Sequence, residues 1–240
     1  MNTGSPLVSI ITVTYNAGDY LQRCINSITA HAPAGTEYII IDGSSTDNTL
    51  DIIRNNAAHI TYWESGPDEG IYDAMNKALR YAKGAWIYFL GADDRLKEGF
   101  TQMLPMLRDT HTLYHGTALC GDSMIGRSSY DAYQVASLNL CHQTIFYPRL
   151  VFDKYRYETK YKVRADHYLN MLCFADRELK LQFYPYTICD YHPGGFSSAT
   201  ADPAFDNDLE HIIRENFGYW TLLRYKLRII RHRIKGKNSR

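Results

Sequence analysis

Residues 7–15, LVSIITVTY, and residues 37–42, EYIIID, are two apolar runs rich in β-branched side chains. The apolar positions that recur between them at helical spacing are Tyr20, Leu21, Cys24, Ile25 and Ile28. A strand, a helix and a second strand in this order form a βαβ unit, in which both strands run parallel and the crossover is right-handed. The sequence therefore opens with a parallel sheet.

The alternation of strand and helix continues to residue 94. Possible helix caps at residues 44–46 precede DNTLDII (47–53), and HITYWES (59–65) has the pattern of a strand. Residues 71–82 repeat apolar positions on one helical face, and AWIYFL (85–90) follows as the next strand. This order predicts an α/β fold with a mostly parallel sheet and helices on both faces. Active sites in such sheets lie beyond the carboxyl ends of the strands.

The pattern weakens after residue 100. We expect strands within TLYHGTALCGD (112–122), CHQTIFY (141–147) and LKLQFYPYTICDY (179–191), and a helix at ADHYLNMLCFA (165–175). No repeat, low-complexity segment or linker interrupts this region, so a single domain is predicted.

Charge separates this domain from the end of the chain. The 240 residues contain 26 basic and 26 acidic side chains, and 45% of them are hydrophobic, which supports a sizeable core. Eight Lys or Arg and no acid fall in residues 220–240, so the rest carries 18 basic against 26 acidic side chains. We therefore expect an acidic domain over residues 1–219 and a basic tail over 220–240.

The cysteines and the N-terminus indicate the cellular compartment in which the protein is expected. Five cysteines without CxxC spacing argue against a zinc site or a disulfide framework and favour a reducing environment. The N-terminus lacks the basic region of a signal peptide, and no apolar run approaches the roughly 20 residues that span a bilayer. The sequence predicts a cytoplasmic protein.

Two adjacent carboxylates follow the apolar strand in AWIYFLGADD (85–94), although such neighbours repel each other and resist desolvation. Neither GxGxxG nor GxxxxGK[ST] occurs, which leaves the usual dinucleotide and P-loop sites without support. The acids expected around the rim are Asp42, Asp68, Asp93, Asp94 and Asp166. Acids repel a phosphate unless a divalent cation intervenes, so we expect a nucleotide diphosphate held through Mn²⁺ or Mg²⁺.

Four motifs in order then carry a resemblance: VSIITVTYN, IIIDGSSTDNT, ESGPDEGIYDAMNKAL and FLGADD. They resemble the family-2 glycosyltransferases with a GT-A fold, densely over residues 7–100 and more thinly through CHQTIFY, VRADHYL and YHPGGFS. The most similar subgroup is the bacterial enzymes that assemble capsule, exopolysaccharide or the O-antigen of lipopolysaccharide. The resemblance implies a nucleotide-sugar-binding half over residues 1–100 and an acceptor-side half over 101–219.

The resemblance also implies site residues. Those for the nucleotide-sugar are Thr14, Tyr15, Asn16, Asp42, Asp68, Asn76, Lys77 and Asp93, with Asp42 bonded to the base. Asp94 would bind the metal, with His192 as a second candidate, and Asp166 would be the catalytic base. The residues that match a loop closing over the donor are His192, Gly194, Gly195 and Ser197. Many relatives have an aspartate where this chain has Gly91, which shortens the DxD motif to its last two acids.

Structural explanations exist for several of these residues. Asp42 before a glycine suits an ordinary turn, and Asp166 suits a helix N-terminus. Lys77 lies four residues after Asp73, the spacing of a surface ion pair. His142 and His192 have the character of packed or loop histidines more than of metal ligands. A non-catalytic nucleotide-sugar-binding or scaffold relative is the alternative, whereas a nucleotidyltransferase would need a Gly-rich basic loop where this chain has TYNAGDY.

The predicted function is an inverting, metal-dependent transfer of a sugar from a nucleotide-diphosphate sugar, expected to be a UDP-sugar. The acceptor is a hydroxyl of a saccharide or a lipid-linked saccharide, and inversion is implied by the resemblance alone. Nucleic acid is not an expected partner.

The basic tail suggests where in the cell the predicted sugar transfer takes place. Its apolar positions are Trp220, Leu222, Leu223, Leu227, Ile230 and Ile234. With eight cationic side chains around them, they predict an amphipathic helix on an anionic membrane, at the inner face of the cytoplasmic membrane. The alternative is a helix packed on the acidic domain with a disordered basic end, and nucleic-acid binding is a third and weaker one.

Overall fold

The computed structural model describes residues 6–194 and 201–237, the last six of these by backbone alone. The first half contains β1 (Val8–Thr14), α1 (Leu21–His31), β2 (Glu37–Asp42), α2 (Thr49–Asn55), β3 (Tyr62–Ser65), α3 (Ile71–Ala78) and β4 (Trp86–Phe89). The second half contains β5 (Arg95–Leu96), α4 (Glu98–Met103), β6 (Thr112–Cys120), β7 (Ser123–Ile125), α5 (Ala132–Ser137), β8 (Ile145–Pro148), α6 (Arg149–Lys154), α7 (Ala165–Ala175), β9 (Lys180–Asp190) and α9 (Pro203–Lys237). Short 3₁₀ turns lie at Ala57–His59, Leu104–Met106 and His142–Thr144.

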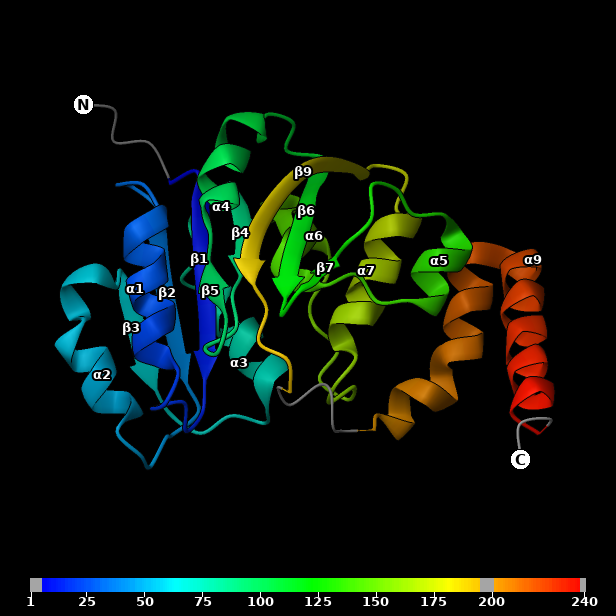
Figure 1. Ribbon diagram of the computed structural model, residues 1–240, viewed down its shortest axis with the longest axis horizontal. Helices are drawn as coiled ribbons and strands as arrows, with labels where there is room; N and C mark the ends of the chain where they lie inside the picture. Colours follow the sequence, from blue (N-terminus) through cyan, green and yellow to red (C-terminus); the bar gives the residue numbers. More distant parts are fainter. Residues whose placement is uncertain (1–5, 195–200, 238–240) are drawn as a thin grey trace.

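All strands in the described part of the chain belong to one nine-stranded sheet, in the order β3-β2-β1-β4-β8-β6-β9-β5 with β7 beside β6 (Figure 1). The four strands of the first half run parallel, as the βαβ pattern predicts. Their register places Thr14 opposite Asp42, and Asp42 opposite Ser65, so these strands end together. Beyond β4 the sheet is mixed, because β8 runs antiparallel to both β4 and β6 while β6 and β9 pair in parallel.

The central strands β1, β2, β4 and β8 are buried on both faces, which explains their almost continuous apolar sequences. Successive side chains of a strand point to opposite faces, so Ile39 and Ile41 join one core while Ile40 joins the other. The first core lies under α3, α5, α6, α7 and α9, and the second lies under α1, α2 and α4. Helices therefore cover both faces, as the sequence predicts.

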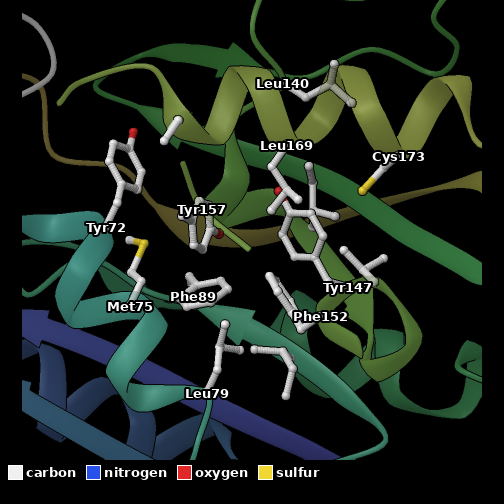
Figure 2. Close-up of a cluster of buried hydrophobic side chains, with 14 of the residues drawn as sticks. Tyr72, Met75, Leu79, Phe89, Leu140, Tyr147, Phe152, Tyr157, Leu169 and Cys173 are labelled. Carbon is white, nitrogen blue, oxygen red and sulfur yellow. The ribbon is translucent and has the colours of Figure 1, made fainter. Parts of the chain in front are cut away.

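An aromatic cluster fixes α3 and α7 to the sheet (Figure 2). The Tyr157 ring lies 5.2 Å from that of Tyr72 on α3 and 5.5 Å from that of Phe89 on β4, measured between ring centroids. Burial of such large rings stabilises the packing, at roughly 25 cal/mol for each Å² of apolar surface removed from water. The Tyr72 hydroxyl is thereby directed toward the start of α7.

Several boundaries differ from the sequence prediction. The strand expected over residues 59–65 begins at Tyr62, and the helix expected over 71–82 ends at Ala78. In the segment 141–147, residues His142–Thr144 form a 3₁₀ turn before β8 begins at Ile145. This turn replaces the first half of the predicted strand and becomes part of the site.

The last helix, α9, consists of two segments. Gly218 has φ 78° and ψ 176°, a conformation outside the helical region, and it interrupts the helix there. The Lys226 ammonium lies 2.7 Å from the Glu210 carboxylate, which holds the two segments side by side (Figure 1). Within the described residues, no helix is long and apolar enough to cross a membrane.

Candidate active site

The loops that follow β1 and β2 are joined to each other at the carboxyl ends of the strands. Asn16 has φ 49°, and its side-chain oxygen accepts a hydrogen bond from the Thr46 amide at 2.9 Å. The Asn16 amide donates to the Ser45 hydroxyl at 2.8 Å. Asn tolerates the left-handed conformation better than most residues. Asn16 therefore shapes this rim from both its side chain and its backbone.

Asp42 is the last residue of β2 and lies at the rim, as the sequence predicts. Its carboxylate is fully buried and accepts hydrogen bonds from the Ser45 amide at 2.9 Å and the Ser65 hydroxyl at 2.6 Å. The Ser45 hydroxyl donates to the other carboxylate oxygen. With its oxygens engaged and hidden, Asp42 organises the loops rather than offering a free acceptor to a base. A hydrogen bond between Asp42 and the base of a nucleotide stays a prediction.

Thr14, the last residue of β1, and Tyr15 directly after it both lie at this rim. The side chain of Tyr15 is 65% exposed, so its ring has a free face at the rim. The Thr14 hydroxyl is buried and has no hydrogen-bond partner among the described residues. An aromatic face beside an unpaired hydroxyl is suited to a nucleobase, through stacking and one hydrogen bond.

Asp68 also lies at this rim. A Cβ placed on Gly43 would lie 2.6 Å from Asp68 Oδ2, so the carboxylate covers the backbone directly after Asp42. Its other oxygen accepts a hydrogen bond from the Gly70 amide at 2.9 Å. The structure thus brings Asp68 next to the β2 loop.

Asn76 and Lys77 have structural partners instead of open groups. The side-chain nitrogen of Asn76 donates a hydrogen bond to the Tyr157 carbonyl at 2.9 Å. Its side-chain oxygen accepts one from the Tyr157 backbone amide at 3.1 Å. Lys77 pairs with Asp73 at 2.9 Å and donates to the Pro67 carbonyl at 2.8 Å. Both side chains bind the protein's own groups here, and their contacts with the ribose or diphosphate stay a prediction.

Asp94 follows β4 and is 1% exposed. Its carboxylate accepts hydrogen bonds from the His192 amide at 2.8 Å, the Gln143 side chain at 3.1 Å and the Gly91 amide at 3.2 Å. Burial raises the pKa of Asp94 to about 6, and the charge of neighbouring Asp93 adds to the rise. The hydrogen bond from the His192 backbone amide acts in the opposite direction and lowers this pKa. A cation bound nearby would stabilise the ionised form of this buried carboxyl group.

The residues at Gly91 fit a divalent cation. A Cβ on Gly91 would lie 2.6 Å from Asp94 Oδ2 and 2.8 Å from Asp93 Oδ1, so both carboxylates converge over a position that only glycine leaves open. In the described ranges, no group of three or more His, Cys, Asp or Glu side chains gathers to enclose a metal alone. Two carboxylate oxygens leave the remaining ligand positions to phosphates, which is the arrangement Mg²⁺ and Mn²⁺ favour.

His192 contacts Asp94 through its backbone amide, while its ring lies 5.3 Å from that of Tyr20 between centroids. Metal binding by the His192 ring stays a prediction. Gly194, the next residue expected in a closing loop, is exposed with φ 102°. Gly195 and Ser197 lie outside the described residues.

Asp166 lies in the first turn of α7 and is 6% exposed. Its carboxylate accepts hydrogen bonds from Asn139 at 2.7 Å and from the Tyr72 hydroxyl at 3.0 Å, and it lies 3.1 Å from His142 Nδ1. Burial opposes the charge of Asp166, but the hydrogen bond and charge of His142 outweigh it and lower the pKa of this carboxyl. The carboxylate is therefore ionised and firmly held.

One 3₁₀ turn connects the two acids. Its residues His142 and Gln143 are adjacent, and the first contacts Asp166 while the second contacts Asp94. The acids from β4 and α7 thus belong to a single site. Sequence reasoning found both acids but missed Gln143, Asn139 and Tyr72 as their partners. The polar residues in LNLCHQT (138–144), directly before a buried strand, were the available signal.

Comparisons with known proteins identify the family of this chain. The glycosyl transferase family 2 profile matches residues 9–117. A PGL/p-HBAD biosynthesis glycosyltransferase of Mycobacterium bovis (strain BCG / Pasteur 1173P2) is 31% identical over 212 residues, which cover 84% of this chain and 83% of that relative. The putative teichuronic acid biosynthesis glycosyltransferase TuaG of Bacillus subtilis (strain 168) is 38% identical over 103 residues, 41% of this chain and 40% of TuaG. The chain therefore belongs to glycosyl transferase family 2 and is a glycosyltransferase.

Solved structures share the fold. S. aureus TarS 1-349 in complex with UDP-GlcNAc superposes with a TM-score of 0.70 at 16% identity, over 87% of this chain and 66% of that one. The mannosyltransferase PcManGT from Pyrobaculum calidifontis, in complex with GDP-Man and Mn²⁺, superposes with a TM-score of 0.63 at 18% identity, over 92% of this chain and 73% of that one. This chain spans just under two thirds of the length of TarS 1-349 in complex with UDP. These likenesses confirm the predicted GT-A fold.

Proposed function

We propose that this glycosyltransferase moves a sugar from a UDP-sugar to a hydroxyl of a saccharide or lipid-linked saccharide, with inversion and with the help of a divalent cation. The reaction would belong to bacterial surface glycan assembly. The observation that carries the proposal is the single site in which buried Asp94, next to Asp93, is linked through one turn to Asp166.

The donor would lie across the carboxyl ends of the parallel strands. Tyr15 offers its exposed ring to the base, and Thr14 offers an unpaired hydroxyl. Asn16 and Asp42 keep the two rim loops in place, and Asp68 adds a carboxylate beside them. Support for a UDP donor comes from the TarS complex with UDP-GlcNAc, at the level of a shared fold.

Asp93 and Asp94 would hold Mn²⁺ or Mg²⁺ together with the donor phosphates. Such an ion supplies electrostatic stabilisation for a departing diphosphate. The PcManGT complex with Mn²⁺ supports this reading of the fold. Asp94 is kept in position by the His192 amide and Gln143, so its orientation does not depend on the ligand.

The transfer itself needs one displacement. The acceptor oxygen forms a bond to the anomeric carbon from the face opposite the diphosphate, whose bond to that carbon breaks at the same time. The acceptor proton passes to the acid–base centre around Asp166. Help of this kind is worth roughly 10²–10⁴-fold in rate. Because the acceptor oxygen attacks from the face opposite the leaving diphosphate, the configuration at the anomeric carbon inverts.

The acceptor is expected at a membrane surface, and the tail supports this. Trp220 is 80% exposed, and Leu223, Leu227 and Ile230 are each exposed by 43–51%. The other face of the same segment packs against the core through Leu222. We therefore treat residues 1–219 as the catalytic domain and residues 220–240 as a membrane-contacting tail. The peripheral position would be the inner face of the cytoplasmic membrane, where lipid-linked acceptors are reachable.

A transfer assay tests the proposed function. The full chain with Mn²⁺ is mixed with a panel of UDP-sugars and of saccharide and prenyl-phosphate-linked saccharide acceptors, and the product is analysed by NMR. We expect transfer with an inverted anomeric configuration, and Asp166→Asn should lower turnover by roughly 100-fold or more with little change in donor affinity. A product with retained configuration, or near-normal turnover of Asp166→Asn, would refute the mechanism.

A further inference from the structure

A cavity of about 340 Å³ lies in the second half of the chain, between the sheet and the helices α5 and α7. Its walls come from β6, β8, β9, α5, α7 and the residues just before α5. Protein interiors leave few voids larger than a water molecule, and an apolar cavity of roughly 150 Å³ is enough to bind benzene. By that ratio, this cavity has room for on the order of a dozen carbon atoms of a ligand.

The inner wall of the cavity is apolar. Val135 on α5 and Ile145 on β8 are fully buried, and Leu113 on β6 is 4% exposed. Cys173 is buried as well, and Figure 2 shows it on the side of α7 that faces the sheet. A wall of this kind holds water poorly and favours a hydrocarbon.

The ionisable groups on the inner wall carry no charge near pH 7. Burial lowers the pKa of His115 to about 4, although the Gly116 backbone acts in the opposite direction. Burial raises the pKa of the Cys173 thiol, and the charge of Asp176 adds to the rise. A charged group inside the cavity would lose its hydration without meeting an opposite charge, which is costly. The inner wall therefore selects an uncharged group.

The outer part of the cavity is polar. Ser128, Ser129 and Lys180 belong to its lining and are exposed. The Lys180 ammonium lies 3.0 Å from the Asp109 carboxylate, so this part holds an ion pair at the surface. A molecule with an apolar chain and a polar end matches this division, with its chain inside and its polar end among these side chains.

The cavity lies between the acid of α7 and the last helix. Asn170 belongs to the lining and donates a hydrogen bond to the Asn139 side-chain oxygen at 3.1 Å, and Asn139 donates to Asp166 at 2.7 Å. Phe174, four residues further along α7, also lines the cavity, and its ring centroid lies 6.1 Å from that of Phe217 on α9. Figure 1 shows α5, α7 and α9 side by side at one end of the sheet. The cavity is thus next to both the proposed catalytic acid and the helix proposed to contact a membrane.

We propose that this cavity binds the hydrocarbon chain of an amphiphile, whose polar end lies at Ser128, Ser129 and Lys180. Two kinds of molecule share this chemistry: a straight-chain membrane lipid and an isoprenoid carrier of a lipid-linked acceptor. The binding is non-covalent. It takes place outside the donor site, so its test does not depend on the proposed sugar transfer.

Calorimetric titration of the full chain with n-alkyl phosphates, from hexyl to tetradecyl and each below its critical micelle concentration, measures this binding. EDTA is present, so that the phosphate cannot bind through a metal ion at Asp93 and Asp94. We expect affinity to rise roughly two- to fourfold for each added methylene group that is buried, up to about a dozen carbons. Longer chains should bring no further gain, because the cavity is then full.

Geranyl and farnesyl phosphate distinguish the two sources of the chain. Each is compared with the n-alkyl phosphate of the same carbon number, so that the polar end stays constant. Tighter binding of the prenyl phosphates identifies an isoprenoid carrier as the ligand, and tighter binding of the alkyl phosphates identifies a straight-chain lipid.

Two variants locate the binding in the cavity. Val135→Phe fills the cavity with a ring, and Leu181→Asp places a charge on its wall. Each should weaken the binding of decyl phosphate by roughly 10-fold or more, because several methylene groups lose their contacts. The matched control is Leu50→Asp, since Leu50 is half-buried like Leu181 but lies on α2 against the other core. This control should bind decyl phosphate like the wild type.

Urea unfolding establishes that each variant is folded. Leu181 is only half-buried, so Leu181→Asp keeps the test intact if Val135→Phe does not fold. Three results would overturn the proposal: no binding of any alkyl or prenyl phosphate, an unchanged affinity of folded Leu181→Asp, or an affinity that keeps rising through tetradecyl phosphate, as in adsorption to the surface.

Discussion

Asp94 shows how a residue can serve binding at the expense of stability. Its carboxylate is 1% exposed beside a second acid, and its pKa is raised from 3.8 to about 6. The folded protein therefore holds a proton there more tightly than the unfolded chain does. Such a contribution to stability is fully present below pH 3.8 and is lost as the pH rises through 6.

Asp94→Asn removes this titration, so the difference in unfolding free energy between the variant and the wild type should change with pH. We expect the unfolding free energy of the variant, relative to that of the wild type, to rise by up to about 3 kcal/mol between pH 4 and pH 7. This figure corresponds to a pKa shift of about two units at 1.36 kcal/mol for each unit. Urea unfolding of both proteins without divalent cations measures this difference at each pH. The titration of the other carboxyl groups is common to both proteins and cancels in the difference. A difference that is constant across this range would contradict the raised pKa.

Tyr15 is predicted to stack on the base of the donor. Removing its exposed ring in Tyr15→Ala should weaken UDP binding by about 5- to 100-fold, because stacking of a base on an aromatic ring is worth roughly 1–3 kcal/mol. Tyr15→Phe keeps the ring and should bind UDP like the wild type. Calorimetry compares the three proteins, and equal affinities of Tyr15→Ala and Tyr15→Phe would exclude stacking.

At this scale the sequence predicts some residues and not others. Asp94 stands out because two acids follow a fully apolar strand. The engagement of Asn76 could not be read from its surroundings, because its partner Tyr157 is 81 residues away. Likewise, Asp42 is buried by Ser65 from the neighbouring strand, a contact that depends on the register of the sheet.

At the scale of elements, local patterns predict the first half well. Strand–helix–strand units place their partners close in sequence, and the parallel order of the first four strands follows from them. The second half pairs strands that are far apart, such as β6 and β9, so its topology depends on contacts that no local pattern contains. The break of α9 at Gly218 was also missed, since one glycine inside a helical pattern is a weak signal.

The second segment of α9 has two apolar faces with different roles. Leu222 and Tyr225 pack against the core, while Trp220 and Leu223 are exposed. Two of its cations are paired with the domain, since Arg224 lies 3.8 Å from Asp131 and Lys226 lies 2.7 Å from Glu210. Docking on the domain thus accounts for one face of the helix and leaves the other face exposed, which is the face proposed to contact a membrane.

Removing the exposed face tests this function of the helix. The double variant Trp220→Ser and Leu223→Ser should bind anionic liposomes at least 10-fold more weakly, because each buried apolar side chain contributes roughly 1.5–3 kcal/mol. The control Leu7→Ser changes another exposed residue, 42% accessible and outside the tail. Co-sedimentation at low and high salt measures binding, and equal binding of both variants would exclude this face as the membrane contact.

At the scale of the whole molecule, one continuous sheet joins the two halves that we propose to bind the donor and the acceptor. The parallel strands present the rim with Tyr15 and Asp94, and the mixed part carries α7 with Asp166. The turn His142–Thr144 lies between the halves and contacts both acids. The proposed metal-binding acid and the proposed catalytic acid are therefore connected by two adjacent residues.

The most direct test of this account is a calorimetric titration of UDP into the protein with Mn²⁺, and again with EDTA. We predict that UDP binds with Mn²⁺, and that binding is lost with EDTA and in Asp94→Ala. The control variant Asp153→Ala, which changes an exposed acid on α6, should bind like the wild type. UDP affinity that is unaffected by EDTA and by Asp94→Ala, or no UDP binding with Mn²⁺ present, would contradict the account.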